Sequence, residues 1–254
     1  MNFIVYYKQL RGDAMKFILE VILYLYIYSF LGWACESIYC SVGNRKIINR
    51  GFLSGPLCPI YGLGALAIIY LLKMYTNNII LLFVYGTIIT SSLEYLGGYL
   101  LEKIFNTRWW DYSRKIFNIK GRICLKNSTL FGIMCVLLVK VIHPLVTQFT
   151  QVIPLPLLIG TTIIISIIFL IDLSFTIDAI NKLNNKLRGV DDAIIESSKM
   201  PEKLQEELYF NKILFIKEKS ILQRRIINAF PNMKHNHKHE QLQFVAKIIK
   251  EKIK

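Results

Sequence analysis

The sequence lacks the signatures of several soluble protein classes. No G-x-x-x-x-G-K-[ST] motif occurs in its 254 residues, so the chain does not bind ATP through a P-loop. Its cysteines have no paired short spacing of the kind that holds zinc, and we assign no metal, cofactor or catalytic residue. We expect reduced thiols, because four of the five cysteines fall on the side predicted below to be cytoplasmic. The cysteines are Cys35, Cys40, Cys58, Cys124 and Cys135.

Acidic residues are also scarce, at 17 against 31 Lys and Arg, which gives a net charge of +14. Yet 54% of the residues are hydrophobic and the mean hydropathy is +0.41, too apolar for an ordinary soluble domain. Both facts hold because charges and apolar residues occupy different stretches. We predict an N-terminal extension (1–14), a transmembrane bundle (15–178) and a basic, cytoplasmic helical tail (179–254), and we expect no nucleic-acid partner.

The apolar runs predict an all-α, polytopic helical membrane protein in a lipid bilayer. Crossing a hydrocarbon core takes about 20 helical residues. Four stretches reach that length, at 15–39, 78–101, 129–149 and 154–178. A fifth, 60–74, is apolar but short. We therefore expect about five transmembrane helices, the second one broken or re-entrant at its start.

Basic loops set the expected orientation. The loops before the second and fourth spans are rich in Lys and Arg, whereas the other two carry almost none. The positive-inside rule then places the N-terminus outside and the C-terminus in the cytoplasm of a multi-pass plasma-membrane protein. Lys8, Arg11 and Lys16 oppose this orientation, less so if Met15 rather than Met1 is the start, which the sequence leaves open.

Ionisable residues inside the predicted spans need a partner or a cavity, because each costs at least about 2.5 kcal/mol at mid-helix. Four such residues are candidates for intramembrane polar sites: Glu36, Glu94, Lys140 and His143. Counting depth along ideal helices favours an ion pair between Glu94 and Lys140. A structural role, with Lys140 extending its stem to the interface, is the alternative.

Residues 49–64 hold four glycines and two prolines and cannot form an uninterrupted helix. Non-helical backbone at membrane depth is tolerated where it is buried in protein or lines a cavity. A helix starting near Pro59 would point free N–H groups at the cytoplasmic face, where Arg50 would help them attract anions. A tight loop leading into an ordinary span is the alternative.

The loop between the third and fourth spans combines aromatic and basic residues. Arg108, Asp111 and Arg122, with Trp109 and Trp110 beside them, are candidates to form with Arg50 an anion-binding or substrate-binding pocket at the cytoplasmic mouth. The simpler interpretation is an interfacial segment whose Trp and Arg side chains contact anionic lipid.

Nine short blocks spread along the sequence carry a resemblance to known proteins. They are YSFLGW (28–33) with Glu36, NRGFLSGPLCPIYG (49–62), EY (94–95), LEK (101–103), RWWDYS (108–113), GRICL (121–125), IHP (142–144), RR (224–225) and AFP (229–231). Together these blocks resemble one family, the CmpB-like type IV ABC-transporter permeases. The resemblance implies a membrane permease, whose ATPase would have to be a separate subunit, and it implies no substrate.

Two other functions remain open at this stage. The chain could bind or act on an anionic lipid headgroup at the cytoplasmic face, or it could be a membrane-anchored scaffold that works through its tail. An enzyme is the less favoured interpretation, because no nucleophile or metal set is recognisable. Whether the chain forms a homo-oligomer is not determined by the sequence.

Overall fold

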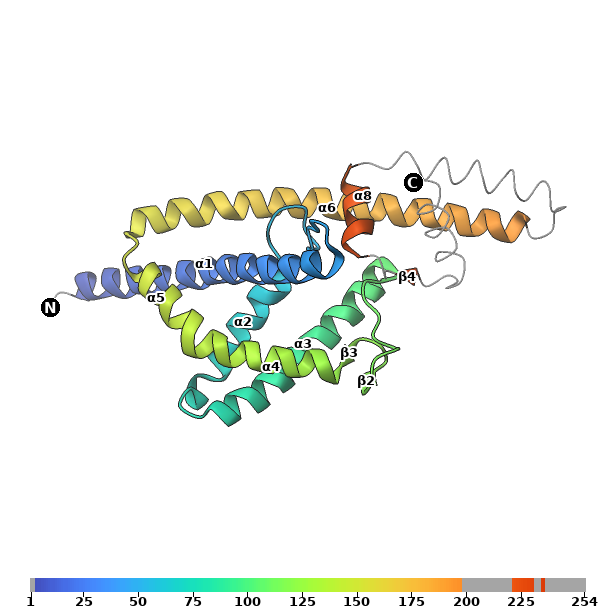
Figure 1. The fold of residues 1–254 in the computed structure, drawn as a ribbon. Coiled ribbons are helices and arrows are strands. Elements are labelled where there is room, and N and C mark those ends of the chain that lie inside the picture. Colours follow the sequence, from blue (N-terminus) through green and yellow to red (C-terminus); the bar gives the residue numbers. More distant parts are fainter. Residues whose placement is uncertain (1–2, 198–220, 231–233, 236–254) are drawn as a thin grey trace.

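The computed structural model describes residues 3–197, 221–230 and 234–235 (Figure 1). Within them, four helical stretches are long and apolar enough to cross a membrane, at Gly12–Gly43, Ile79–Phe105, Leu125–Gln151 and Leu155–Asn185. These coincide with the four long predicted spans. The prediction of an all-α, polytopic helical protein is thereby confirmed.

The short fifth stretch forms helix α2 (Pro59–Leu71). Its 13 residues rise only about 20 Å, less than a hydrocarbon core. Pro59 stands in its first turn, where the missing N–H costs nothing. The residues before it, 45–58, are non-helical, and a 3₁₀ turn (Lys73–Tyr75) follows it.

The outer helices are longer than the sequence predicts. Helix α1 (Phe3–Asn44) begins well before the predicted start at 15, and α6 (Leu155–Ser197) continues far beyond residue 178. Neither contains a proline in its interior that would break it. Helix α3 (Ile79–Phe105) is delimited locally, since the Asn78 side chain accepts a bond from Leu81 N and Asn106 adopts the left-handed conformation at its end.

The fourth span is one continuous stretch made of α4 (Leu125–Leu137), a π-helical turn (Leu138–Ile142) and α5 (His143–Gln151). Pro144 lacks the N–H that would bond to the Lys140 carbonyl in an α-helix. The π turn accommodates this gap, with the His143 amide bonded to the Leu138 carbonyl instead.

Helices α1 and α6 run side by side, α2 packs on α1, and α3 packs on α2 and on α4 (Figure 1). Small residues allow the closest approaches. A Cβ on Gly62 of α2 would collide with Leu25 O and Ser29 of α1, and one on Gly86 of α3 would collide with Cys135 of α4.

One end of the bundle carries both long connections, 45–58 and 106–124; we call it the loop end. Short strands order the second connection, as β2 (Asn118–Ile119) pairs with β3 (Ile123–Cys124). Strand β1 (Thr107–Arg108) pairs with β4 (Lys234–His235) from the tail, and α8 (Ile221–Ala229) lies beside α6 at this end (Figure 1).

Candidate functional site

At the loop end, Arg50 joins α1 to the C-terminal segment. Its Nε lies 3.2 Å from Glu36 Oε1, and its backbone N–H donates to Ser37 Oγ. One terminal nitrogen donates to the Ala229 carbonyl of α8. The two charged side chains are only 19% and 27% exposed, so the pair is largely desolvated and depends on both partners.

The non-helical residues beside Arg50 are held by side chains of two helices. Asp172 of α6 accepts bonds from the N–H groups of Ser54 (3.1 Å) and Gly55 (2.8 Å). Trp33 of α1 donates to Asn49 Oδ1, and Asn49 donates in turn to the Ser54 carbonyl. These bonds replace the helical ones, which explains how irregular backbone is accommodated within the bundle.

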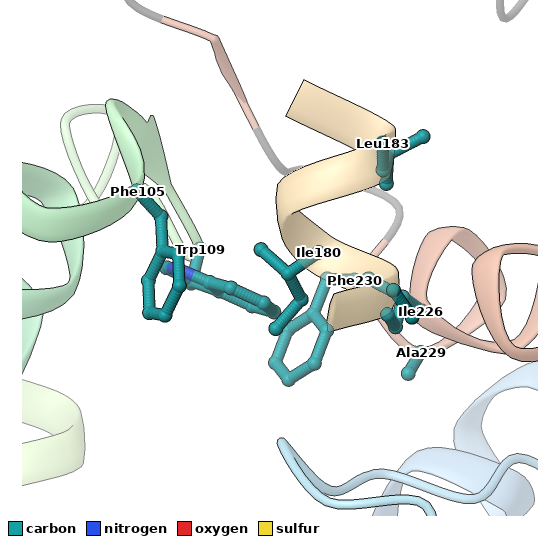
Figure 2. Close-up of a cluster of buried hydrophobic side chains, with 8 residues drawn as sticks. Phe105, Trp109, Ile180, Leu183, Ile226, Ala229 and Phe230 are labelled. Atoms are coloured by element: carbon teal, nitrogen blue, oxygen red, sulfur yellow. The ribbon is translucent and has the colours of Figure 1, made fainter. Parts of the chain in front are cut away.

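Helix α8 closes over this segment. Arg225 donates to the carbonyls of Gly51 and Phe52, at 3.0 Å each. The Phe230 ring packs under the Arg50 guanidinium, 4.5 Å from ring centroid to Cζ, and edge-on against Trp109 at 4.9 Å. Figure 2 shows the cluster that α8 completes. Its buried members are Phe105, Trp109, Ala179, Ile180, Leu183, Ile226, Ala229 and Phe230.

A second charged group lies where α3 ends. Glu102 accepts from Arg122 at 2.8 Å and from Arg108 at 3.4 Å, and Arg108 also lies 3.7 Å from Asp111. The Arg122 guanidinium covers the rings of Tyr95 and Tyr99 on α3. Trp110 Nε1 donates to the Arg122 carbonyl. The aromatic-basic loop is thus fixed to α3 by ion pairs and rings.

Glu94 lies further inside α3 and is 8% exposed. Its Oε1 accepts from the hydroxyl of Tyr112, in the 106–124 loop, at 3.2 Å. Its Oε2 is buried and has no hydrogen-bond partner among the described residues. Burial and the nearby Glu94 carboxylate raise the pKa of Tyr112, so this phenol stays protonated and acts as the donor.

The predicted ion pair between Glu94 and Lys140 is wrong. The two residues form no ion pair with each other, and Lys140 is exposed. It lies in the π turn, where helical depth and direction depart from an ideal helix. His143 instead contacts α1, since the Tyr28 hydroxyl lies 2.7 Å from its Nδ1.

The predicted anion-pocket residues divide into two groups. Arg50 belongs to the Glu36 and α8 group, whereas Arg108 and Arg122 pair with Glu102, and Asp111 lies beside Arg108. Trp109 connects the two groups through Phe230. Every one of the three guanidinium groups already has a carboxylate within 3.4 Å, so the pocket remains a hypothesis about another arrangement of these side chains.

Three residues of the site were assigned no such role from the sequence. Asp172 is the first of these, although its four-residue spacing to Thr176 places both on one face, and Thr176 Oγ1 lies 3.3 Å from Asp172 Oδ1. Tyr112 and Glu102 occur in the sequence only as members of the RWWDYS and LEK blocks. Their partners come from distant segments, which a linear pattern does not indicate.

Fold and site together define a polytopic helical membrane protein with buried ion pairs at its loop end. The chain belongs to the family described as "Putative ABC-transporter type IV", whose model matches residues 23–177. This stretch contains the bundle and both site loops and ends before α8. No curated protein and no solved structure matches the chain.

Proposed function

We propose that the chain is the membrane-embedded permease subunit of a transporter whose ATPase is a separate polypeptide. The family match covers the membrane bundle, and the sequence contains no P-loop. The basic loops favour a plasma-membrane protein with the N-terminus outside and the loop end and C-terminus in the cytoplasm.

The observation that carries the proposal is the irregular backbone that precedes α2, a helix too short to cross a membrane by itself. Residues 51–58 are irregular, are bonded to Asp172 and adjoin the Glu36–Arg50 pair. In membrane transporters, interrupted helices with polar groups at the break form binding sites for solutes. In this chain, polar side chains of α1 and α6 hold the irregular 45–58 connection in place. A scaffold that only anchors its tail in the membrane would not need this arrangement.

An ATPase subunit would dock at the loop end. The tip of the 106–124 connection presents two apolar side chains, Ile116 and Phe117, that are 80% and 76% exposed. Arg114 and Lys115 precede them and are also exposed. Apolar anchors with a charged rim are typical of docking surfaces. The same tip favours a second candidate, contact with anionic lipid headgroups.

Purification of the tagged chain from native membranes in mild detergent tests both ideas. We expect a P-loop ATPase and the chain to copurify, and we expect Ile116→Ser with Phe117→Ser to remove the ATPase. Leu125→Ser, an exposed apolar change just outside the tip, is the control. Preparations that never contain an ATPase contradict the permease proposal. Loss of bound phosphatidylglycerol without loss of a protein favours the lipid role.

A further inference from the structure

The Glu94 carboxyl is the most unusual buried polar group in the bundle. It comes from the middle of an apolar helix, and the described residues around it supply one O–H donor, from Tyr112, and no cation. An isolated ionised carboxylate is so costly in such surroundings that the group takes up a proton instead. The observed contacts suit the neutral acid, with Oε1 as the acceptor and Oε2 as the hydroxyl oxygen.

The charges around Glu94 support the same conclusion. Glu36 of α1 is near enough for its carboxylate to interact electrostatically with Glu94, and it adds negative charge. Arg50 is already bound to Glu36, and Arg122 is bound to Glu102. From α2, Tyr61 faces Glu36 and Tyr112, and Cys124 of β3 lies near Tyr112. No described group in this set is a cation available to Glu94.

We propose that Glu94 is a proton-binding site inside the bundle, holding one proton on Oε2 and releasing it toward water at the loop end as the pH rises. Tyr112 is half-buried and belongs to the surface connection 106–124, so it lies on the side where exchange with water is expected. The site does not depend on the permease proposal, because it requires only the bundle and its loop.

Carbodiimide labelling tests the site directly in the full-length chain. Dicyclohexylcarbodiimide reacts with protonated carboxyl groups in apolar surroundings, and mass spectrometry locates the adduct. In phosphatidylcholine vesicles we expect an adduct on Glu94 that falls by about tenfold per pH unit above its midpoint, within a scan from about pH 5 to about pH 9. Glu36, ion-paired with Arg50, is the matched control and should remain unlabelled.

Two variants separate protonation from reagent access. Glu94→Gln should abolish the adduct and also remove a protonated-carboxyl C=O stretching band from the infrared spectrum. Tyr112→Phe removes the donor that stabilises the ionised form, so the midpoint should move to higher pH. The proposal is overturned if Glu94→Gln leaves the infrared band unchanged, or if the Glu94 adduct is independent of pH. Equal labelling of Glu36 and Glu94 would also overturn it.

Discussion

Glu36 and Glu94 lie near the same end of the bundle, yet the surroundings of their two carboxyl groups differ, since only Glu36 has a cationic partner among the described residues. Glu36 has a guanidinium 3.2 Å away, and that guanidinium is bonded in turn to the Ala229 carbonyl of α8. Glu94 has the Tyr112 phenol on one oxygen, and its other oxygen has no hydrogen-bond partner within the described part of the chain. Glu36 is thus held as a charge by Arg50, which α8 holds in turn, while Glu94 is suited to bind a proton.

The difference separates a site that should stay structurally fixed, Glu36, from a site whose protonation should change with pH, Glu94. A desolvated ion pair loses much stability when either partner is removed, so the Glu36 site is expected to stay fixed. A lone acid exchanges a proton without moving a helix. Stability should therefore depend on the Glu36 site, and pH dependence on the Glu94 site.

The largest expected effect comes from Arg50→Met. It leaves Glu36 without its cation in a desolvated position, and we expect a loss of about 3 kcal/mol in the free energy of unfolding, at the lower end for buried pairs. The measurement is detergent-solubilised unfolding in rising SDS. Lys182→Met is the control, because the Lys182–Asp178 pair is 66% and 55% exposed and should contribute little.

A second substitution identifies the cause of the stability loss in Arg50→Met. If the loss in Arg50→Met comes from the stranded charge, Glu36→Gln in the same chain should restore at least about half of it. A double variant no more stable than Arg50→Met would show that lost packing against α8, rather than the charge on Glu36, causes the effect.

A smaller effect is expected from Phe230→Ala, which tests whether α8 closes the Glu36 site. Phe230 is buried against Trp109 and Arg50, so its loss should weaken docking of α8 by about 2 kcal/mol, roughly a thirtyfold rise in the undocked population. Trypsin cleavage after Arg225 should accelerate accordingly. Ile221→Ala, at a position 87% exposed, is the control, and equal cleavage rates in the two variants would contradict the closure.

The sequence predicted the four long helices well, because length and hydropathy alone determine a span. It also named Arg50, Glu36 and Glu94 as candidate site residues. It did not predict that Asp172 bonds the backbone of Ser54 and Gly55, or that Phe230 covers Arg50, because these contacts join segments more than a hundred residues apart. The prediction that Lys140 pairs with Glu94 assumed an ideal α-helix. It was wrong because Pro144 converts the preceding turn from α to π geometry.

The smallest effect should come from Lys140→Met, and it tests the comparison most directly. Were Lys140 the cation of Glu94, its removal would destabilise the bundle as strongly as Arg50→Met. Because Lys140 is exposed and forms no ion pair with another described residue, we expect a change within about 0.5 kcal/mol in SDS unfolding. Carbodiimide labelling of Glu94 should also keep its pH midpoint. A midpoint shifted to higher pH would mean that Lys140 stabilises the ionised form after all, and Glu94 would then resemble Glu36 rather than contrast with it.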